Sequence, residues 1–291
     1  MGGTSSEREV SLQSGKNIAE ALASLGKYDV ISVDVRDESL DAMPKDVDAV
    51  YIALHGGWGE NGGVQAALNA LKIPYTGPGV TASQIAMDKA ATKRRLEENG
   101  VSTAKWALVR SDAKASPLPL PVVVKPPCDG SSVGISKVSS EDEWAGALAA
   151  AAKAMKAAGD ILVEAYVPGR EFTVAVVDGE AWPVIEIVAK GGWYGYEEKY
   201  NSNETRYPFL ENCELAERLQ RAAVAAYAAV GCRGVTRVDF RVSPEGACHV
   251  LELNTSPGFT SHSLVPKSGM RTGLTFAGVC DRILSSADYD R

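Results

Sequence analysis

One segment restricts the fold of this sequence more than any other: residues 234–258, which read GVTRVDFRVSPEGACHVLELNTSPG. Apolar residues alternate with polar ones from position 235 to 242 and return at positions 250, 251 and 253. A period of two is typical of β-strands, and Pro244-Glu245-Gly246 supplies turn residues between the two runs. The segment therefore predicts an antiparallel β-hairpin.

Four polar side chains of this hairpin are expected on one face. Side chains two residues apart share a face, as Arg237 does with Asp239 and Glu252 with Asn254. If the turn centres between its second and third residues, Asp239 lies opposite Glu252, and Arg237 lies opposite Asn254. Two facing carboxylates destabilise a sheet unless a cation lies between them, and oxygen ligands suit Mg²⁺. We predict a metal site; the alternative is an exposed edge hairpin with solvated charges.

The rest of the sequence predicts an α/β protein of two or three packed units. Its 291 residues are 45% hydrophobic and 23% charged, an ordinary composition for a globular protein. In the first unit, strands are expected at 30–35, 49–54 and 73–77, and a glycine-rich loop and a helix follow the second strand. Strand, loop and helix in this order predict a parallel sheet.

The later units are predicted from the same kind of pattern. In the second unit, we expect two helices, a strand that ends at Lys125, an alanine-rich helix over 142–158 and a strand over 161–164. In the third unit, two strands, a long loop and a helix should precede the hairpin, at 172–177, 181–187, 189–209 and 214–230.

The sequence opens with MGGTSSEREVSL, in which Gly2-Gly3 is expected to turn the chain into a helix. Thr4 and Ser6 each have a glutamate three residues later. This spacing predicts a capping box, in which the hydroxyl and the carboxylate bind amide groups at the start of the helix.

Charge and cysteine content narrow the class of protein. A net charge of −7 argues against a protein that coats nucleic acid. No apolar run is long enough to span a bilayer, and no basic segment followed by an apolar one stands at the start. Five scattered cysteines without C-x-x-C spacing favour reduced thiols. We therefore predict a cytoplasmic protein without a membrane or nucleic-acid partner.

A second group of residues suits a phosphate-bearing ligand. The strand PVVVKP ends in Lys125, and the loop GSSVGIS behind it could present backbone N–H groups to phosphate oxygens. On its own such a loop is equally consistent with a hairpin turn, and it is not a Walker A sequence. Lys89, in MDKAATK, is a candidate second cation; the alternative is a solvated lysine on a helix.

Nine motifs, in order along nearly the whole chain, resemble the bacterial D-alanine–D-alanine ligase family of the ATP-grasp superfamily. They are MGGTSSEREVSLQSG, ALHGGWGENGGVQ, IPYTGPGVTAS, MDKAATK, VVVKPPCDGSSVGISKV, PGREFTVAV, EEKYNSNETRY, TRVDF and LELNTSPGFTSHSLVP. The resemblance implies an α/β fold, α+β in the C-terminal lobe, with a Rossmann-like N-terminal domain before the ATP-grasp fold. The expected domains are 1–77 (substrate), 78–167 (central lobe) and 168–291 (C-terminal lobe with lid and metal site).

The resemblance also implies the nucleotide site. Members bind ATP between the central and C-terminal units and bridge its phosphates with two Mg²⁺, for which Mn²⁺ can substitute. The resemblance places the metal ligands at the hairpin residues Asp239, Glu252 and Asn254. Lys89, Lys125 and Lys199 would contact the nucleotide. Glu164 would lie at the adenine, and Glu171 would lie at the ribose. Residues 190–206 resemble the lid that closes over the phosphates.

The implied activity is the ligation of two D-alanines for peptidoglycan precursor synthesis, through an acyl phosphate. The resemblance makes the Arg237 guanidinium and the Gly258 N–H the donors to the tetrahedral intermediate. Ser263 and Leu264 would hold the carboxylate of the second substrate. His55 would lie near the first D-alanine; the alternative is a capped loop histidine.

A Glu7–Ser131–Tyr200 hydrogen-bond network is a pattern of the family, and all three residues are present. In this family a tyrosine in the lid accompanies amine acceptors, whereas phenylalanine accompanies D-lactate, so Tyr200 predicts dipeptide synthesis. The alternatives are a D-alanine–D-lactate or other D-amino-acid ligase, a nucleotide-binding homologue with impaired turnover, and an ATP-dependent kinase or biotin-carboxylase-like enzyme. The last would lack the EREVSL and SHSLV elements, which are present.

Two further expectations follow from the resemblance. One is that the protein forms a homodimer. Members have an apolar strand before the first glycines, so the N-terminal domain is expected to lack its first strand, with Met1 an internal methionine at the end of that strand. If the short form is the functional one, Glu7 lies on a weakened platform and binding of the first substrate should suffer.

Overall fold

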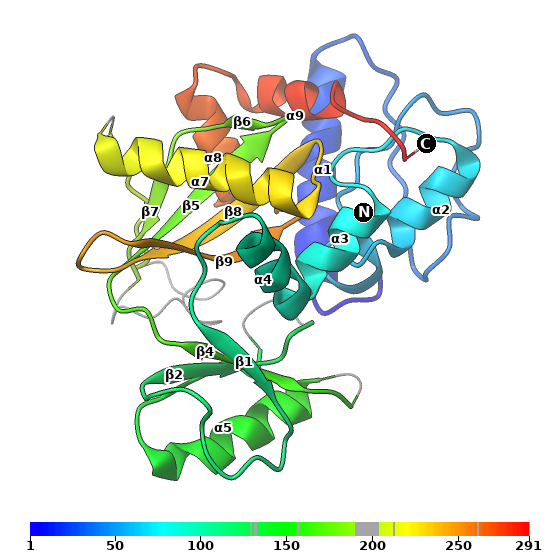
Figure 1. Ribbon diagram of the computed structural model, residues 1–291. Coiled ribbons are helices and arrows are strands. Elements are labelled where there is room, and N and C mark those ends of the chain that lie inside the picture. Colours follow the sequence, from blue (N-terminus) through cyan, green and yellow to red (C-terminus); the bar gives the residue numbers. More distant parts are fainter. Residues whose placement is uncertain are drawn as a thin grey trace.

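The computed structural model describes residues 1–128, 130, 133–155, 158–189, 204–211, 213–260 and 262–290. Figure 1 shows three parts: an N-terminal part at the upper right, a sheet-and-helix unit at the bottom, and a larger sheet covered by helices at the upper left. Within the described ranges no helix has the length and apolar character needed to cross a bilayer.

The N-terminal part contains α1 (Arg8–Ser24), the short 3₁₀ helix η1 (Gly57–Gly59) and α2 (Gly63–Leu71). The expected parallel sheet is present only as isolated parallel bridges, between Gly2 and Val35 and between Val50 and Tyr75. The prediction of regular strands over 30–35, 49–54 and 73–77 is therefore wrong for the described structure. One reason is local: Gly2 and Gly3 have φ angles of 92° and 88°, which take the chain out of the extended region after one bridge.

The predicted capping box is also wrong. Helix α1 has Glu7 as its N-cap residue, and no side chain caps it. Ser5, which lies between the two expected capping hydroxyls, orders this turn instead. Its Oγ donates to the carbonyl oxygen of His55 at 2.5 Å and accepts from the backbone N–H of Glu7 at 3.2 Å. The helix start is therefore attached to the loop after residue 54.

The central unit begins with α3 (Val80–Met87) and α4 (Lys89–Glu98), the two helices expected there. Its antiparallel sheet has the order β1-β4-β2-β3, and α5 (Glu141–Ala154) packs on it. The bounds of the strands are Trp106–Val109 (β1), Val122–Lys125 (β2), Ser136–Val138 (β3) and Ile161–Ala165 (β4). Strands ending at Lys125 and covering 161–164 are thus confirmed, while the alanine-rich helix ends four residues earlier than predicted.

The C-terminal unit is built on a sheet of order β6-β5-β8-β9, with β7 also paired to β5. The strands are Arg170–Val177 (β5), Glu180–Ala181 (β6), Ile185–Ile187 (β7), Val235–Val242 (β8) and Cys248–Asn254 (β9). The prediction of one strand over 181–187 is wrong, because Pro183 has no N–H for a ladder and separates β6 from β7. The helices are α7 (Glu214–Val230), as predicted, then α8 (Leu264–Arg271) and α9 (Phe276–Leu284).

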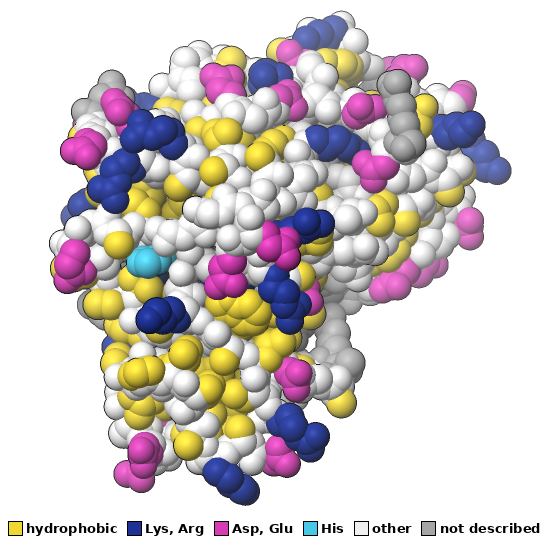
Figure 2. Space-filling view, in the orientation of Figure 1, with side chains coloured by type: hydrophobic (Ala, Val, Ile, Leu, Met, Phe, Trp, Pro, Cys, Tyr) yellow, Lys and Arg dark blue, Asp and Glu magenta, His cyan; other side chains and the backbone are white. Residues whose placement is uncertain are grey.

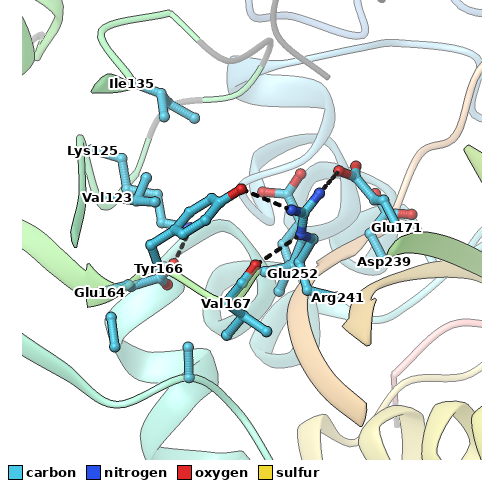
Figure 3. A pocket seen from close by; sticks show the side chains of 13 residues that line it. Val123, Lys125, Ile135, Glu164, Tyr166, Val167, Glu171, Asp239, Arg241 and Glu252 are labelled. Atoms are coloured by element: carbon cyan, nitrogen blue, oxygen red, sulfur yellow. Dashed lines mark hydrogen bonds and ion pairs between the residues drawn. The ribbon is translucent and has the colours of Figure 1, made fainter. Parts of the chain in front are cut away.

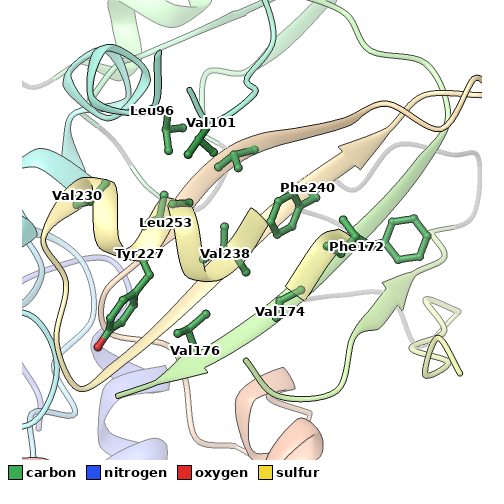
Figure 4. Close-up of a cluster of buried hydrophobic side chains, with 14 of the residues drawn as sticks. Leu96, Val101, Phe172, Val174, Val176, Tyr227, Val230, Val238, Phe240 and Leu253 are labelled. Carbon is green, nitrogen blue, oxygen red and sulfur yellow. The ribbon is translucent and has the colours of Figure 1, made fainter. Parts of the chain in front are cut away.

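The two faces of this larger sheet have different partners. One face packs against α7, α3 and α4, in a cluster that includes Phe172, Val238, Phe240 and Leu253 (Figure 4). The other face packs against α1, α8 and α9 at one end, through Ala175, Val177 and Val235. On this second face β5 changes from apolar to polar side chains, because Thr173 and Glu171 follow at the same spacing of two. The polar end is where a site can form.

The last described residues return to the N-terminal part. Tyr75 and Asp288 form an antiparallel bridge, with backbone hydrogen bonds of 3.0 and 3.2 Å. The Asp290 carboxylate accepts from the Val80 N–H at 2.8 Å and from the Asn69 side chain at 3.1 Å. Segments that are far apart in the sequence are thereby joined where α3 begins.

Candidate active site

A cavity of about 770 Å³, partly open to solvent, lies between the two sheets. Figure 3 shows side chains from both sheets directed into it. Its lining combines apolar side chains with five of the residues singled out from the sequence, Lys125, Glu164, Glu171, Asp239 and Glu252. The apolar part includes Val123, Ile135, Val167 and Leu251. A mostly apolar cleft with a few converging charges is typical of a cofactor or substrate site.

The register of the hairpin is as predicted at the polar positions. Asp239 pairs with Glu252, and Arg237 pairs with Asn254. The turn is centred on its middle residue, Glu245, half a residue before the predicted centre, because the N–H of Ser243 donates to the carbonyl oxygen of Ala247. A β-bulge next to Asp239 shifts the register by one and brings the polar pairs into line. The predicted turn centre is thus wrong, and the predicted pairing is confirmed.

Both hairpin carboxylates have cationic partners. The Arg237 guanidinium donates to both oxygens of Asp239, at 2.9 and 2.8 Å, and Thr173 Oγ1 donates to Asp239 Oδ1 at 2.6 Å. Lys89 Nζ lies 3.5 Å from Glu252 Oε2. These contacts neutralise the facing carboxylates that the sequence analysis expected a metal to neutralise. Within the described ranges no group of three or more His, Cys, Asp or Glu side chains is arranged so that it could hold a metal ion.

The donor set nevertheless suits a hard cation that also binds a phosphate. Asp239, Glu252 and Asn254 offer carboxylate and amide oxygens as ligands, and Mg²⁺ takes one or two carboxylates together with water and substrate phosphates. Asn254 Oδ1 accepts from the N–H of Ser256 at 3.1 Å, which fixes its side chain. The solvated-lysine alternative for Lys89 is wrong, because this residue is only 6% exposed.

Lys125 and Glu164 form a buried ion pair at the entrance to the central sheet. Lys125 Nζ lies 2.6 Å from Glu164 Oε2, and Lys93 Nζ lies 2.8 Å from Glu164 Oε1. Burial raises the pKa of Glu164, but the two lysines outweigh burial and hold that pKa below its usual value. Glu164 is therefore ionised, and its carboxylate is bound to two lysines.

Glu171 is held by Arg241 on the opposite wall. Arg241 donates to Glu171 Oε2 at 3.3 Å, to the Val167 carbonyl at 3.2 Å and to the Tyr166 hydroxyl at 3.3 Å, as Figure 3 shows. Lys137 Nζ lies 4.0 Å from the centre of the Tyr166 ring. This cluster gives the cavity a polar edge beside its apolar lining.

A second group of predicted residues gathers around the start of α1. A Cβ placed on Gly56 would lie 2.6 Å from Glu7 Oε2, and one placed on Gly130 would lie 3.9 Å from it. The carboxylate of Glu7 thus lies between the loop after residue 54 and the loop after Lys125. The glycines at 56 and 130 leave room for it.

His55 is buried beside this group and is hydrogen-bonded at both nitrogens. Its Nδ1 lies 2.8 Å from the Ser256 carbonyl oxygen, and its Nε2 lies 3.2 Å from Ser14 Oγ. Burial lowers the pKa of His55, while the charge of Glu7 acts to raise it. The neutral ring therefore donates from Nδ1 and accepts from Ser14, which in turn accepts from the Phe259 N–H at 3.0 Å. These contacts agree with the alternative given above, a capped loop histidine.

The loop before α8 brings the remaining predicted residues close to Ser14. A Cβ on Gly258 would lie 3.1 Å from Ser263 Oγ and 3.9 Å from Ser14 Oγ. Ser263 is the N-cap residue of α8, and no side chain caps this helix. The N–H groups of Leu264 and the residues after it therefore begin the helix without a capping side chain, a place that suits a carboxylate.

The comparisons with known proteins decide the family. Residues 96–285 match "D-ala D-ala ligase C-terminus", and residues 34–78 match "D-ala D-ala ligase N-terminus". The chain belongs to the D-alanine–D-alanine ligase family. Its fold is accordingly the ATP-grasp fold expected from the sequence.

Relatives in this family match over nearly the whole chain. D-alanine–D-alanine ligases of Syntrophotalea carbinolica and Anaeromyxobacter dehalogenans are 44% and 43% identical; each match covers 94% of the relative and 99% or 98% of this chain. A crystal structure of the Bacillus anthracis D-alanine–D-alanine ligase superimposes with a TM-score of 0.86 at 33% identity, covering 98% of this chain and 95% of that one. The same enzyme complexed with ATP gives 0.86 at 32% identity, covering 98% and 94%.

Three residues expected from the family pattern, Ser131, Lys199 and Tyr200, lie outside the described residues, as do positions 190–203 of the predicted lid. The structure brings the other predicted residues together in two adjoining groups. The first group, expected at the nucleotide, contains Lys89, Lys125, Glu164, Glu171, Asp239, Glu252 and Asn254. The second group, expected at the amino acids, contains Glu7, His55, Gly258, Ser263 and Leu264. Arg237 is bound to Asp239 between them.

Several residues of the site were missed by the sequence analysis. Ser14, Thr173 and Arg241 contact predicted residues through the fold alone. Lys93 had a signal, because it follows Lys89 by one helical turn within MDKAATK. Glu60, in the glycine-rich loop, was also missed. Burial and, to a smaller extent, the charge of Glu7 raise the pKa of Glu60 to about 8.

Proposed function

We propose that this protein joins two D-alanine molecules to D-alanyl-D-alanine with hydrolysis of ATP to ADP and phosphate, for peptidoglycan precursor synthesis. The observation that carries the proposal is the adjacency of a two-sheet nucleotide cavity and the Glu7–His55–Gly258 group, in a chain of this family. One group provides for a triphosphate, and the other provides for two amino acids.

ATP would enter the cavity with its base among Val123, Ile135 and Leu251 and its ribose toward Glu171. The backbone at Glu164 would face the base, since the carboxylate of that residue is bound to two lysines. Lys89 and Lys125 would meet the phosphates, with Lys199 from the lid. Each lysine would exchange a carboxylate partner for a phosphate oxygen.

Two Mg²⁺ ions, or Mn²⁺ in their place, would be held by Asp239, Glu252 and Asn254. They would supply neutralisation of charge on the phosphates. Arg237, displaced in part from Asp239, would then have donors for the developing negative charge of the reaction.

The first D-alanine would bind with its ammonium at Glu7 and its carboxylate toward the phosphates. Attack of this carboxylate on the γ-phosphate gives ADP and an acyl phosphate. The second D-alanine would bind with its carboxylate at the start of α8, at Ser263 and Leu264. Its amine attacks the acyl carbon, the Gly258 N–H and Arg237 donate to the oxyanion, and phosphate leaves. Ser131 and Tyr200 would order the amino-acid site with Glu7.

The test is ADP release coupled to product identification. Purified protein with Mg²⁺ and ATP should release D-alanyl-D-alanine from D-alanine, and L-alanine should give none. D-lactate and D-serine are compared as acceptors. Formation of D-alanyl-D-lactate in preference to the dipeptide would show that the acceptor assignment is wrong, and absence of ADP release with every acceptor would refute the proposal as a whole.

Three further statements belong to this proposal. We propose domain limits of 1–77, 78–167 and 168–291, a cytoplasmic location and a homodimer. Sedimentation equilibrium of the purified protein tests the last of these: a single species with the mass of one chain would refute the dimer.

A further inference from the structure

A fully buried lysine lies behind the nucleotide cavity. The Lys93 side chain is 0% exposed, and its Nζ donates to Thr103 Oγ1 at 2.7 Å. The Thr103 hydroxyl donates in turn to the carbonyl oxygen of Val250 on β9, at 2.8 Å. Lys93 is thereby fixed to Thr103, which bridges β9 of the larger sheet and lies just before β1 of the central sheet.

The other contact of Lys93 is with the carboxylate that holds Lys125. Lys93 binds Glu164 Oε1 at 2.8 Å, and Lys125 binds Glu164 Oε2 at 2.6 Å. Glu164 is 2% exposed and lies on the central strand β4, where it is paired with Trp106 and Val123. Two lysines and one carboxylate thus share a buried site. Burial lowers the pKa of Lys93, and the charge of Glu164 opposes that shift. With both lysines protonated, the site has one positive charge in excess.

This arrangement changes what Lys125 can do. If Lys125 were the sole partner of Glu164, its movement toward a phosphate would leave a buried carboxylate unpaired, which is strongly unfavourable. With Lys93 on Oε1, Glu164 keeps a cationic partner whichever way Lys125 points. The excess positive charge then faces the cavity, because Lys125 lines it and Lys93 does not.

We propose that Lys93 is a positioning residue for nucleotide binding: it compensates the charge of Glu164 and so makes Lys125 available to the phosphates. The inference rests on the proposed ATP site. Lys93 acts on nucleotide binding through Glu164, and it affects only the binding of the phosphates. Lys93 itself does not reach the nucleotide.

The experiment measures binding of ATP and of adenosine, each with Mg²⁺ and without D-alanine, by titration calorimetry. Lys93→Met keeps the length of the side chain and removes its charge. We expect ATP to bind about tenfold more weakly to this variant, and adenosine, which has no phosphate, to bind within about twofold of the wild type. A parallel weakening of both ligands would mean that Lys93 only shapes the cavity, and would overturn the inference.

A second pair of variants tests the route through Glu164. In a Glu164→Gln background no charge needs compensation, so adding Lys93→Met should change ATP affinity by less than about threefold. A further loss of about tenfold there would overturn the inference. This comparison also decides the question if Lys93→Met alone does not fold. Thr103→Val, which removes the anchor but no charge, is the control and should leave ATP affinity within about threefold of the wild type.

The outcomes separate this inference from the proposed function. A wild-type protein that binds no ATP contradicts the proposed function itself. A wild type that binds ATP, together with a Lys93→Met variant of equal affinity, contradicts only the role of Lys93.

Discussion

Of the four carboxylates that line the cavity, three are paired with cations that come from other elements, and Asp239 is paired with Arg237 of its own strand. Glu164 binds lysines of α4 and β2, Glu171 binds Arg241 of β8, and Glu252 of β9 binds Lys89 of α4. Such pairs satisfy buried charges in the absence of ligand, and their cations are also the groups that a triphosphate needs. Nucleotide binding at the proposed site would therefore be an exchange of these partners.

The hydroxyl of Thr173 should matter more to the metal than to the fold. It is 2% exposed and donates to Asp239 Oδ1, so it orients an expected metal ligand. For Thr173→Val we expect a loss of about 1 kcal/mol in unfolding free energy. The Mg²⁺ concentration for half-maximal ADP release should rise about tenfold, since groups behind metal ligands have effects of this size. Thr236→Val, buried on β8 and paired with Val176, is the control. An unchanged Mg²⁺ requirement in Thr173→Val would refute this role.

His55 should make stability depend on pH. Burial lowers the pKa of His55 in the folded protein, so between this value and about 6.5 the unfolded chain binds the extra proton. Unfolding free energy should therefore fall as pH decreases below about 6.5, by up to about 1.4 kcal/mol per pH unit, and level off below the folded pKa. Urea unfolding of wild type and His55→Asn across this range isolates the effect, with His249→Asn as the control. Equal slopes for wild type and His55→Asn would show that His55 does not titrate on unfolding.

At this scale the sequence predicted the residues of the site better than their partners. Asp239, Glu252 and Asn254 could be placed because the period of a strand fixes the face of each side chain. That Arg237 binds Asp239, or that Lys93 binds Glu164, could not be read from the sequence, because these contacts depend on rotamers and on the packing of α4 against two sheets.

At the level of elements, the bulge in β9 explains a pattern that simple alternation does not. Apolar residues stand at 250, 251 and 253, and a regular strand would direct 251 and 253 to one face. The structure buries Val250 and Leu253 in the core and leaves Leu251 lining the cavity beside Glu252. The extra residue in the strand, Leu251, thus supplies an apolar wall beside Glu252, an expected metal ligand.

Two matched substitutions test this division. Leu253→Asn places an amide in the core and should lower unfolding free energy by about 2–4 kcal/mol. Leu251→Asn should affect stability much less, but should raise the KM for ATP about tenfold, because it makes the base-binding wall polar. Thermal unfolding and steady-state kinetics measure the two effects. The same loss of stability in both variants would contradict the division.

Elements with a strong pattern were predicted well, and elements that depend on distant partners were not. Helix α7 was predicted to the residue, since its apolar face and its flanking segments are both clear. The sheet of the N-terminal part was predicted from apolar runs, but it pairs only at single bridges. Strand ladders need a partner in register, and an apolar run does not reveal one.

At the level of the whole molecule, charged side chains of both signs are interspersed over the face in Figure 2, so local pairs rather than one large patch dominate its electrostatics. A local contact of a charged side chain also joins the last described residues of the chain to α3. Asp290 binds the first N–H of that helix, 210 positions away, and so has the place that an N-cap residue takes in other helices.

Replacement of Asp290 should loosen this connection. For Asp290→Ala we expect a loss of about 1 kcal/mol or less in unfolding free energy, because the side chain is 41% exposed and solvent weakens its interactions. Hydrogen exchange should become faster at the N–H of Val80. Asp288→Ala, which keeps the backbone bonds to Tyr75, is the control. Unchanged exchange at Val80 in Asp290→Ala would refute the capping role.

Helix α1 packs against α9, with Ile18 and Leu22 in the same buried cluster as Val279 and Ile283. During synthesis these two helices leave the ribosome far apart in time, because some 250 residues lie between them. At about 5–20 residues per second the delay is on the order of tens of seconds. Throughout this interval the apolar face of α1 lacks its packing partner α9. This long-range contact thus leaves the apolar face of α1, a kind of surface that chaperones recognise, incompletely covered until α9 emerges.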